Sequence, residues 1–159
     1  MNMTRRSALS FAGLAATAAI AWPHRALASY EVSLSDGQWR AKLSPAAYRV
    51  LRQQDTEVPF SSPLNGEHRS GVFACAGCAL PLYTSRTKFE SGTGWPSFWA
   101  PLCNAVAVTS DTTLGMTRTE VHCRRCGGHL GHVFDDGPRP TGKRYCMNGV
   151  AMTFAARKV

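Results

Sequence analysis

Two Cys-x-x-Cys pairs constrain this chain more than any other feature of its sequence. Cys75 and Cys78 form the first pair, Cys123 and Cys126 form the second, and residues 79–122 separate them. Each short turn directs two thiolates at one point, so two such turns complete the tetrahedral four-cysteine shell that zinc prefers. Because protein ligands then fill every position, the metal would hold structure and carry out no chemistry. The sequence therefore predicts one structural zinc ion.

Two other roles for these cysteines compete with zinc. Disulfide bonds suit an exported protein, and a metal-free pair suits a thiol–disulfide oxidoreductase. Cysteines in such tight pairs are usually metal-binding or redox-active and seldom form structural bridges, and the doubling of the motif favours a metal. A zinc assay of the purified protein separates the three roles.

Residues 1–28 are predicted to be an export signal. Arg5 and Arg6 precede an apolar run over residues 8–22, and residues 26–28 (Ala-Leu-Ala) offer a small-x-small cleavage site. The paired arginines favour the twin-arginine route, which carries folded, metal-loaded proteins and so agrees with zinc. We expect a periplasmic protein with no stable membrane insertion after cleavage. An uncleaved anchor is the alternative, although the run is shorter than the roughly 20 residues of a spanning helix.

The net charge does not indicate a nucleic-acid partner. The chain has 18 Lys and Arg against 10 Asp and Glu, a formal charge of +8, but three of the arginines fall in the predicted signal. The remaining 15 basic residues are scattered and form no basic run. A basic stripe is the usual mark of nucleic-acid binding, so we expect none.

The mature chain is predicted to form one β-rich domain, in which residues 29–70 are an N-terminal arm and residues 71–159 the catalytic core. A mass of 17.2 kDa fits one domain. The 14 Gly and 9 Pro are spread along the chain, which favours short strands over a helical bundle.

Local signals place the elements within this domain. Ser44 and Pro45 are a good N-cap and first residue for one helix that ends near Gln54. The segment 58–66 contains Pro59, Pro63 and Gly66 and cannot form a regular element. Three runs are predicted to be strands separated by Gly and Pro turns, namely residues 71–75, 115–123 and 144–154.

Two cysteines, Cys103 and Cys146, lie outside the Cys-x-x-Cys pairs. Of these, Cys146 is the candidate nucleophile. A strand period of two places Arg144, Cys146 and Asn148 on one face. A nearby cation lowers the pKa of a thiol and favours the reactive thiolate. The alternative is a buried, inert cysteine, the commoner fate of a lone thiol.

Two further groups of residues are candidates for the same site. A bulge at Gly131 would bring His129 and His132 to one side of their strand, where they could act as general acid or base; metal ligation is the alternative role. Trp95 and Trp99, flanked by Gly and Pro, suggest an aromatic-walled pocket, and two ordinary core tryptophans are the alternative.

Together these segments resemble the methionine sulfoxide reductase B family, enzymes that reduce the R epimer of methionine sulfoxide. The resemblance covers roughly residues 38–155. It is carried by residues 56–60, both Cys-x-x-Cys pairs, and residues 92–98, 129–138 and 144–148. It implies a mainly β fold of two antiparallel sheets with peripheral helices, and a structural zinc remote from the active site.

The resemblance also implies a role for each candidate residue. Cys146 would attack the sulfoxide sulfur, His129 and His132 would hold and protonate its oxygen, and Asn148 would orient the site. Trp95 would pack on the methyl group, with Phe98 and Arg144 as further substrate-binding residues. The oxygen would pass to Cys146 as a sulfenic acid while methionine leaves. The substrates would be oxidised methionine residues in proteins, and we expect a monomer.

Two positions depart from the family pattern. Thr93 stands where the family often has the cysteine that resolves the sulfenic acid, and Gly149 stands where a serine is common. The recycling thiol is therefore open: Cys103, the only other free thiol, is one candidate, and an external thioredoxin-like reductant is the other.

A second class of function uses the same residues without catalysis. An exported zinc module would recognise a peptide through the Trp95 pocket, its Cys146 would be inert, and it would keep its ligand affinity in a Cys146→Ser variant.

Overall fold

This computed structural model describes residues 30–159 of the chain. Both α-helices in this part begin after a serine N-cap. Ser44 accepts a hydrogen bond from the Ala47 N–H and starts α2 (Pro45–Gln53) with Pro45 in the first turn. The predicted helix is therefore confirmed. It ends where Gln54 takes a left-handed conformation (φ 58°), a common way to close a helix.

The helix α1 (Asp36–Lys42) was not predicted. Ser35 and Gln38 form a reciprocal capping box at its start, and Trp39 is its one buried residue. Seven residues with one buried side chain show no apolar periodicity, which is why the sequence predicted a single helix in the arm.

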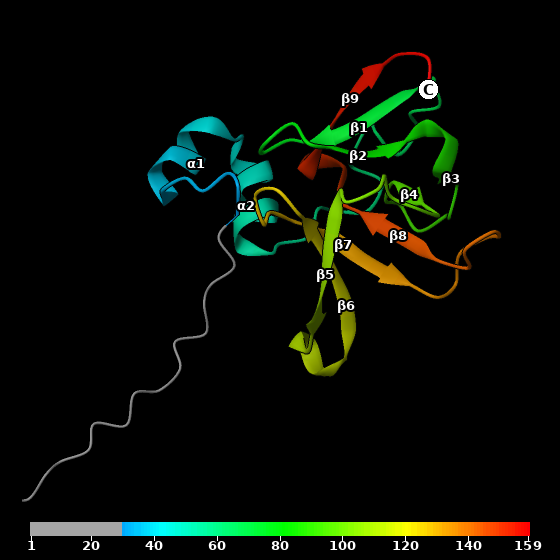
Figure 1. Ribbon diagram of the computed structural model, residues 1–159. Coiled ribbons are helices and arrows are strands. Elements are labelled where there is room, and N and C mark those ends of the chain that lie inside the picture. The colour runs from blue at the N-terminus through cyan, green and yellow to red at the C-terminus, as the bar shows by residue number, and fades with distance from the viewer. Residues whose placement is uncertain (1–29) are drawn as a thin grey trace, which may run out of the picture.

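The strands of the described residues form two antiparallel sheets, with both helices on one side of them (Figure 1). The smaller sheet has the order β2-β1-β9, and the larger has the order β3-β4-β8-β7-β6-β5. The bounds are β1 (Gly71–Cys75), β2 (Pro81–Thr84), β3 (Lys88–Phe89), β4 (Ser97–Phe98), β5 (Val106–Asp111), β6 (Arg118–Cys123), β7 (His129–Phe134), β8 (Arg144–Met147) and β9 (Met152–Ala156). The predicted fold class, mainly β with two antiparallel sheets, is confirmed.

The third predicted strand, residues 144–154, is divided in the structure. A short 3-10 helix, η3 (Gly149–Ala151), separates β8 in the large sheet from β9 in the small one. Both carboxylate oxygens of Glu57 accept hydrogen bonds from the first N–H groups of this turn, at Gly149 (2.6 Å) and Val150 (2.8 Å). A side chain far away in sequence thus stabilises the break, so the local pattern could not reveal it. The predicted strand 71–75 is β1, and the predicted strand 115–123 begins three residues late, at Arg118.

The two sheets enclose an aromatic and aliphatic core. Phe98 stacks on Tyr83 with ring centroids 4.3 Å apart, and Phe73 meets Phe98 edge-on at 4.9 Å. The helix α2 buries Tyr48, Val50 and Leu51, and it packs against β7 and η3. Burial of these large side chains fixes β7 and β8, the strands that carry the candidate catalytic residues.

The predicted export signal, residues 1–28, lies outside the described residues. Within residues 30–159, no helix combines the length and the apolar composition needed to cross a membrane.

Candidate active site and four-cysteine cluster

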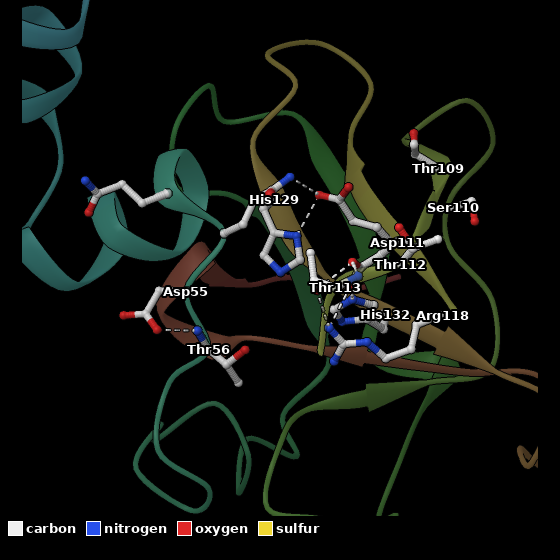
Figure 2. Close-up of a pocket in the computed structure, with 13 residues that line it drawn as sticks. Asp55, Thr56, Thr109, Ser110, Asp111, Thr112, Thr113, Arg118, His129 and His132 are labelled. Carbon is white, nitrogen blue, oxygen red and sulfur yellow. Dashed lines mark hydrogen bonds and ion pairs between the residues drawn. The ribbon is translucent and has the colours of Figure 1, made fainter. Parts of the chain in front are cut away.

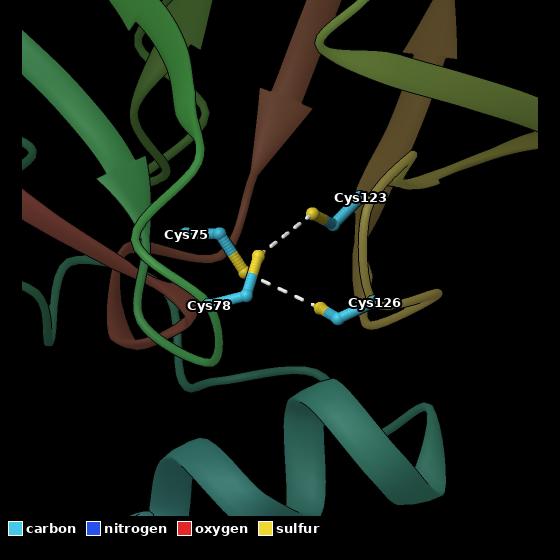
Figure 3. Close-up of side chains that lie close together, drawn as sticks. All are labelled: Cys75, Cys78, Cys123 and Cys126. Carbon is cyan, nitrogen blue, oxygen red and sulfur yellow. Dashed lines mark hydrogen bonds between the residues drawn. The ribbon is translucent and has the colours of Figure 1, made fainter. Parts of the chain in front are cut away.

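The two Cys-x-x-Cys turns come together although they belong to different sheets. Cys75 and Cys78 lie at the end of β1, and Cys123 and Cys126 lie in the turn between β6 and β7 (Figure 3). Their four Sγ atoms all lie within 4.8 Å of one another. The cluster therefore joins the small sheet to the large one.

The donor set fits a tetrahedral metal better than two disulfides. The Sγ atoms of Cys75 and Cys126 are 3.7 Å apart, and those of Cys78 and Cys123 are 3.5 Å apart. Four sulfurs at about 2.3 Å from a zinc ion would be spaced at roughly 3.8 Å, whereas a disulfide bond needs about 2.05 Å. All six cysteines are free thiols. The cluster could bind a metal ion and leaves no ligand position for a substrate.

Cys146 lies on β8 among hydroxyl groups and one cation. In the large sheet it pairs with Ser97 of β4 on one side and His132 of β7 on the other. Its Sγ lies 3.9 Å from Thr93 Oγ1, and Ser91 links the hydroxyls of Thr93 and Ser97 at 2.8 Å each. This chain of hydroxyls can donate to a thiolate.

Two opposing effects act on the Cys146 thiol. Burial raises its pKa above the ordinary value of 9.0, while hydrogen bonding from Thr93 and the charge of Arg144 lower it. Burial is the larger effect, because a thiolate in an apolar pocket loses hydration. The thiol of the free protein is therefore protonated at neutral pH, and the donors around it stabilise the thiolate once it forms.

A small pocket opens over Cys146. Its volume is about 140 Å³, and its lining includes Trp95, His132, Phe134, Cys146 and Asn148. The Trp95 indole N–H donates to the Glu57 carbonyl oxygen at 3.1 Å, which fixes the ring as one wall. An apolar wall beside a thiol and an imidazole suits a small side chain that is apolar at one end and polar at the other.

Asn148 is a structural bridge at the edge of this pocket. Its Oδ1 accepts from the Glu57 N–H at 2.9 Å, and its Nδ2 donates to the Leu130 carbonyl oxygen at 3.1 Å. The residue is only 3% exposed, so these bonds leave little freedom to its carboxamide. Asn148 therefore holds the segment at Glu57 against β7.

A bulge in β7 brings the two histidines to the same side, as predicted. The pairing of β6 with β7 shifts between Val121 and His122, and the ring centroids of His129 and His132 are 5.4 Å apart. Gly131 has φ +154°, and a side chain there would collide with the Cys146 carbonyl oxygen. A glycine is therefore required at the closest approach of β7 to β8.

Each histidine is held by a carboxylate of the neighbouring hairpin. His129 Nδ1 lies 2.7 Å from Glu120 Oε1, and His132 Nε2 lies 2.8 Å from Asp111 Oδ2. Arg118 also donates to Asp111 Oδ2, at 2.7 Å. Figure 2 shows the two histidines, Asp111 and Arg118 on one wall of a second cavity, with Asp55 and Thr56 facing them from the segment that follows α2. This cavity has a volume of about 640 Å³.

The two histidines differ in position. His132 lines both the Cys146 pocket and the second cavity, whereas His129 lines the second cavity only. Burial lowers the pKa of His129, and the hydrogen bond to Glu120 opposes this shift. A neutral imidazole is thus the resting form of His129.

Three predicted site residues do not line the Cys146 pocket. Phe98 is fully buried, with its ring against those of Tyr83 and Phe73. Ser97, one residue earlier, is the residue opposite Cys146. Arg144 pairs with Asp136 through two hydrogen bonds of 2.8 Å. It does not line the Cys146 pocket and acts on the thiol through its charge.

The third of these residues, Cys103, is exposed and lies with the second cysteine turn. The carbonyl of the next residue, Asn104, accepts a hydrogen bond from Arg124 at 2.6 Å. Cys123, at the start of that turn, serves to place it relative to Cys146. On β6, Cys123 is three residues from Glu120, which lies two strands away from Cys146 in the sheet. At ordinary strand spacing, Cys123 and Cys146 are therefore roughly 14 Å apart. A disulfide needs Cα atoms within about 7 Å, so the structure does not bring Cys103 and Cys146 together.

Several residues of the site were not singled out from the sequence. Glu57, Ser97, Asp111, Arg118 and Glu120 all contribute hydrogen bonds to it. Glu57 falls within residues 56–60, one of the segments that carry the resemblance described in the sequence analysis. Asp111 and Glu120 gave no signal, because only the pairing of β5 with β6 places them beside the histidines.

The space beside Gly149 that a side chain would occupy is filled by Ser62. A Cβ atom at this position would lie 2.5 Å from Ser62 Cβ and closer still to Ser62 Oγ. Ser62 is itself buried. The absence of a side chain at Gly149 is therefore accommodated by the hydroxyl of Ser62.

Comparison with known proteins places most of the chain in one family. Residues 43–156 match the family model described as the SelR domain. A peptide methionine sulfoxide reductase MsrB of Leptospira interrogans is 50% identical over 127 residues, which are 79% of this chain and 97% of that protein. The proteins of the same name from Thiobacillus denitrificans and Leifsonia xyli are each 54% identical, over 76% and 79% of this chain and 92% and 91% of their own lengths.

Proposed function

Because this chain belongs to the SelR-domain family of peptide methionine sulfoxide reductases MsrB and is an oxidoreductase acting on methionine sulfoxide, we propose that it reduces the R epimer in proteins through Cys146. The observation that carries the proposal is the pocket in which the Cys146 thiol, the His132 imidazole and the Trp95 ring share one lining. A sulfoxide side chain needs these three partners: a nucleophile for sulfur, an acid for oxygen and an apolar wall for the methyl group.

The reaction begins at the sulfur atom of the substrate. The Cys146 thiolate attacks it and forms a sulfur–sulfur bond, while the sulfoxide oxygen takes a proton. The resulting hydroxyl group then moves to the Cys146 sulfur, as the substrate S–O bond and the sulfur–sulfur bond both break. The products are methionine and a cysteine sulfenic acid, so the sulfoxide is reduced by two electrons and the thiol is oxidised by two. Thr93 and Ser97 stabilise the thiolate by hydrogen bonding, and Arg144 stabilises it by charge.

We assign the acid to His132. It lies in the pocket of Cys146, and His129 does not. Nε2 of His132 is hydrogen-bonded to Asp111, so Nδ1 is the nitrogen that remains to donate the proton to the substrate. Asn148 keeps the pocket in shape through its bridge between Glu57 and Leu130.

The four cysteines of the cluster are proposed to hold one structural zinc ion. Their sulfur spacing supports tetrahedral coordination, and a filled shell supplies a fixed link between the sheets and no catalytic step. Export by the twin-arginine route, a periplasmic location and a monomeric state remain part of the proposal. The first two rest on Arg5, Arg6 and the apolar run that follows.

A stereospecific assay tests the proposed function. Purified protein is given each epimer of N-acetyl-methionine sulfoxide with dithiothreitol, and the thioether product is quantified by chromatography. We expect reduction of the R epimer alone. Reduction of the S epimer at a comparable rate, or of neither epimer, would refute the proposal.

The pH dependence of Cys146 reactivity follows from its burial. Its pKa is raised above 9.0 in the free protein, so the thiolate fraction and the rate of alkylation by iodoacetamide should still be rising as the pH passes 9. Arg144→Met removes a stabilising charge and should move the midpoint higher, by about one unit or more. Mass spectrometry of the peptide that contains Cys146 follows the rate, with Cys103→Ser as the background so that the exposed thiol does not consume reagent. A midpoint near neutral pH would contradict the dominance of burial.

The recycling step is proposed to use an external thiol of the thioredoxin type. Such a thiol condenses with the sulfenic acid, releases water and forms a mixed disulfide, which a second thiol reduces. After one equivalent of substrate without reductant, dimedone should label Cys146 as a sulfenic acid. Thr93→Cys should abolish this label because the introduced thiol forms a disulfide with Cys146, since the side chain of Thr93 already lies 3.9 Å from the Cys146 sulfur. A Cys103–Cys146 disulfide formed at the rate of turnover in the wild type would instead assign resolution to Cys103.

A further inference from the structure

Ser91 joins the two hydroxyl groups that act on the Cys146 sulfur. Its Oγ lies 2.8 Å from Thr93 Oγ1 and 2.8 Å from Ser97 Oγ. Thr93 Oγ1 lies 3.9 Å from the sulfur, and at the other end Ser97 Oγ donates to the Trp95 carbonyl oxygen at 3.1 Å. The three hydroxyls therefore form a continuous hydrogen-bonded path, here called the hydroxyl path, from the nucleophile to the backbone of the pocket wall.

The direction of donation along this path is fixed by its ends. Each hydroxyl has one hydrogen, and a carbonyl oxygen can only accept. With the hydrogen of Ser97 on the Trp95 carbonyl, Ser97 accepts from Ser91, and Ser91 accepts from Thr93. Thr93 Oγ1 is then the acceptor for the hydrogen of the Cys146 thiol. This direction suits the protonated thiol.

A thiolate requires the opposite direction. The sulfur has lost its hydrogen and can only accept, so Thr93 must donate to it. Ser91 must then donate to Thr93, and Ser97 must donate to Ser91, which removes this donor from the Trp95 carbonyl. Ser91 Oγ also accepts from the Thr93 N–H at 3.4 Å. In either direction it accepts this N–H and one hydroxyl hydrogen, so Ser91 can take part in both.

Burial gives this choice of direction its effect. Ser97 is fully buried, and Ser91 and Thr93 are half-buried, so water does not readily replace a missing partner. Hydrogen bonds in a chain also polarise one another, and a donor two steps away strengthens the last bond. A change at Ser91 should therefore reach the Cys146 sulfur through Thr93.

Charged groups around the pocket act on the same thiol by a separate route. They are Arg144 of β8, His132 of β7, Arg118 of β6 and Glu57 of the arm. Each is held elsewhere: Arg144 by Asp136, His132 and Arg118 by Asp111, and the Glu57 carboxylate by the turn at Gly149. A substitution at Ser91 leaves these pairs in place, so it isolates the contribution of the hydroxyl path.

We propose that Ser91 is a positioning residue for the Cys146 thiolate: when the thiol ionises, the hydroxyl path reverses through Ser91. Thr93 then donates to the sulfur, and Ser97 releases the Trp95 carbonyl oxygen. The thiol proton goes to solvent, while the hydroxyls rotate and keep their own hydrogens. The inference rests on the proposed function only in taking Cys146 as the nucleophile, and it links the ionisation of Cys146 to the backbone of the pocket wall.

The first test follows the carbonyl carbon of Trp95. Protein labelled with 1-¹³C-tryptophan is titrated to alkaline pH, and the Trp95 signal is identified by its loss in Trp95→Phe. Alkylation by iodoacetamide in the Cys103→Ser background gives the ionisation midpoint of Cys146 independently. We expect the signal to move upfield with this midpoint, because the carbonyl loses the hydrogen bond from Ser97, and to stay in place in Cys146→Ser. A wild-type signal that does not follow the midpoint would overturn the inference.

Ser91→Ala decides whether the response passes through Ser91. Its Cys146 still ionises, but the path is cut, so the Trp95 carbonyl signal should no longer follow the alkylation midpoint. The matched control is Ser85→Ala, which removes a serine hydroxyl that accepts from the Gly71 N–H at 3.0 Å, outside the Cys146 pocket; it should keep the full response. A full response in Ser91→Ala would contradict the proposal, because Ser97 would then respond to the sulfur directly.

The second test is the pH profile of turnover on the R epimer of N-acetyl-methionine sulfoxide. The profile of kcat/KM reports the ionisation of the free enzyme. Ser91→Ala should move its rise to higher pH by about half a unit, and so lower kcat/KM roughly threefold below the midpoint; Ser85→Ala should match the wild type. An equal loss at every pH with an unchanged midpoint would mean that Ser91 only supports the fold. A wild type that does not reduce the R epimer would refute the proposed function instead, and the carbonyl measurement, which needs no turnover, would still decide the role of Ser91.

Discussion

Replacement of Cys146 by serine should abolish sulfoxide reduction, with a loss of roughly 10⁴-fold or more in kcat. A serine hydroxyl is not ionised at neutral pH and cannot accept the sulfoxide oxygen as a stable sulfenic acid. No other thiol can substitute: four cysteines belong to the cluster, and Cys103 lies with the second cysteine turn, where Asn104 bonds to Arg124. Reduction of the R epimer is followed by chromatography of the thioether.

The same variant discriminates between enzyme and binding module. Oxygen and sulfur differ little in size at this half-buried position, so Cys146→Ser should keep its fold and its affinity for a methionine peptide, both measurable by thermal denaturation and calorimetry. The matched control is Cys103→Ser, which removes an exposed thiol and should keep turnover with dithiothreitol. Measurable catalytic turnover in Cys146→Ser would remove this residue from the chemistry.

Replacement of Cys123 by serine should release the metal and unfold much of the domain. Cys123 is fully buried and lies in the turn that meets Cys75 and Cys78 of the other sheet. Binding of a structural zinc contributes about 10–16 kcal/mol in small domains, which is comparable to the whole stability of a typical protein. A loss of even about 5 kcal/mol should lower Tm by roughly 10–20 °C.

Zinc content and unfolding are measured together. Elemental analysis should find about one zinc per wild-type chain and close to none in Cys123→Ser, and circular dichroism should report the lower Tm. Cys103→Ser again serves as control, with zinc and Tm unchanged. Wild-type protein that is metal-free and has its four cluster cysteines paired as disulfides would refute the zinc assignment.

Chemistry that is local in sequence was predicted well. The Cys-x-x-Cys spacing gave the cluster, the cap at Ser44 gave α2, and Gly131 between the histidines gave the bulge that brings them together. Within each cysteine pair, at the cap and around Gly131, the determining residues lie within a few positions of one another. The backbone has few alternatives there, so the pattern is enough.

The features that the sequence did not predict depend on contacts between residues that are far apart in the sequence. The break between β8 and β9 is stabilised by Glu57, more than ninety residues away. The burial of Phe98 could not be read from the sequence, because β4 has two residues, too few to show which face is buried. The carboxylates of Asp111 and Glu120 reach the histidines only through the register of β5, β6 and β7.

Glu57 has a consequence for how this sequence can vary. Its N–H, its carbonyl oxygen and its carboxylate each serve a different part of the pocket: Asn148, Trp95 and the turn at Gly149. Substitutions at these positions cannot be independent, because residues in one hydrogen-bond network show coupling energies of about 0.5–3 kcal/mol. The effect of a change at Trp95 will depend on which residue occupies position 148, and both effects will depend on position 57. Epistasis in this enzyme should therefore concentrate on one residue of the arm that touches no reacting atom.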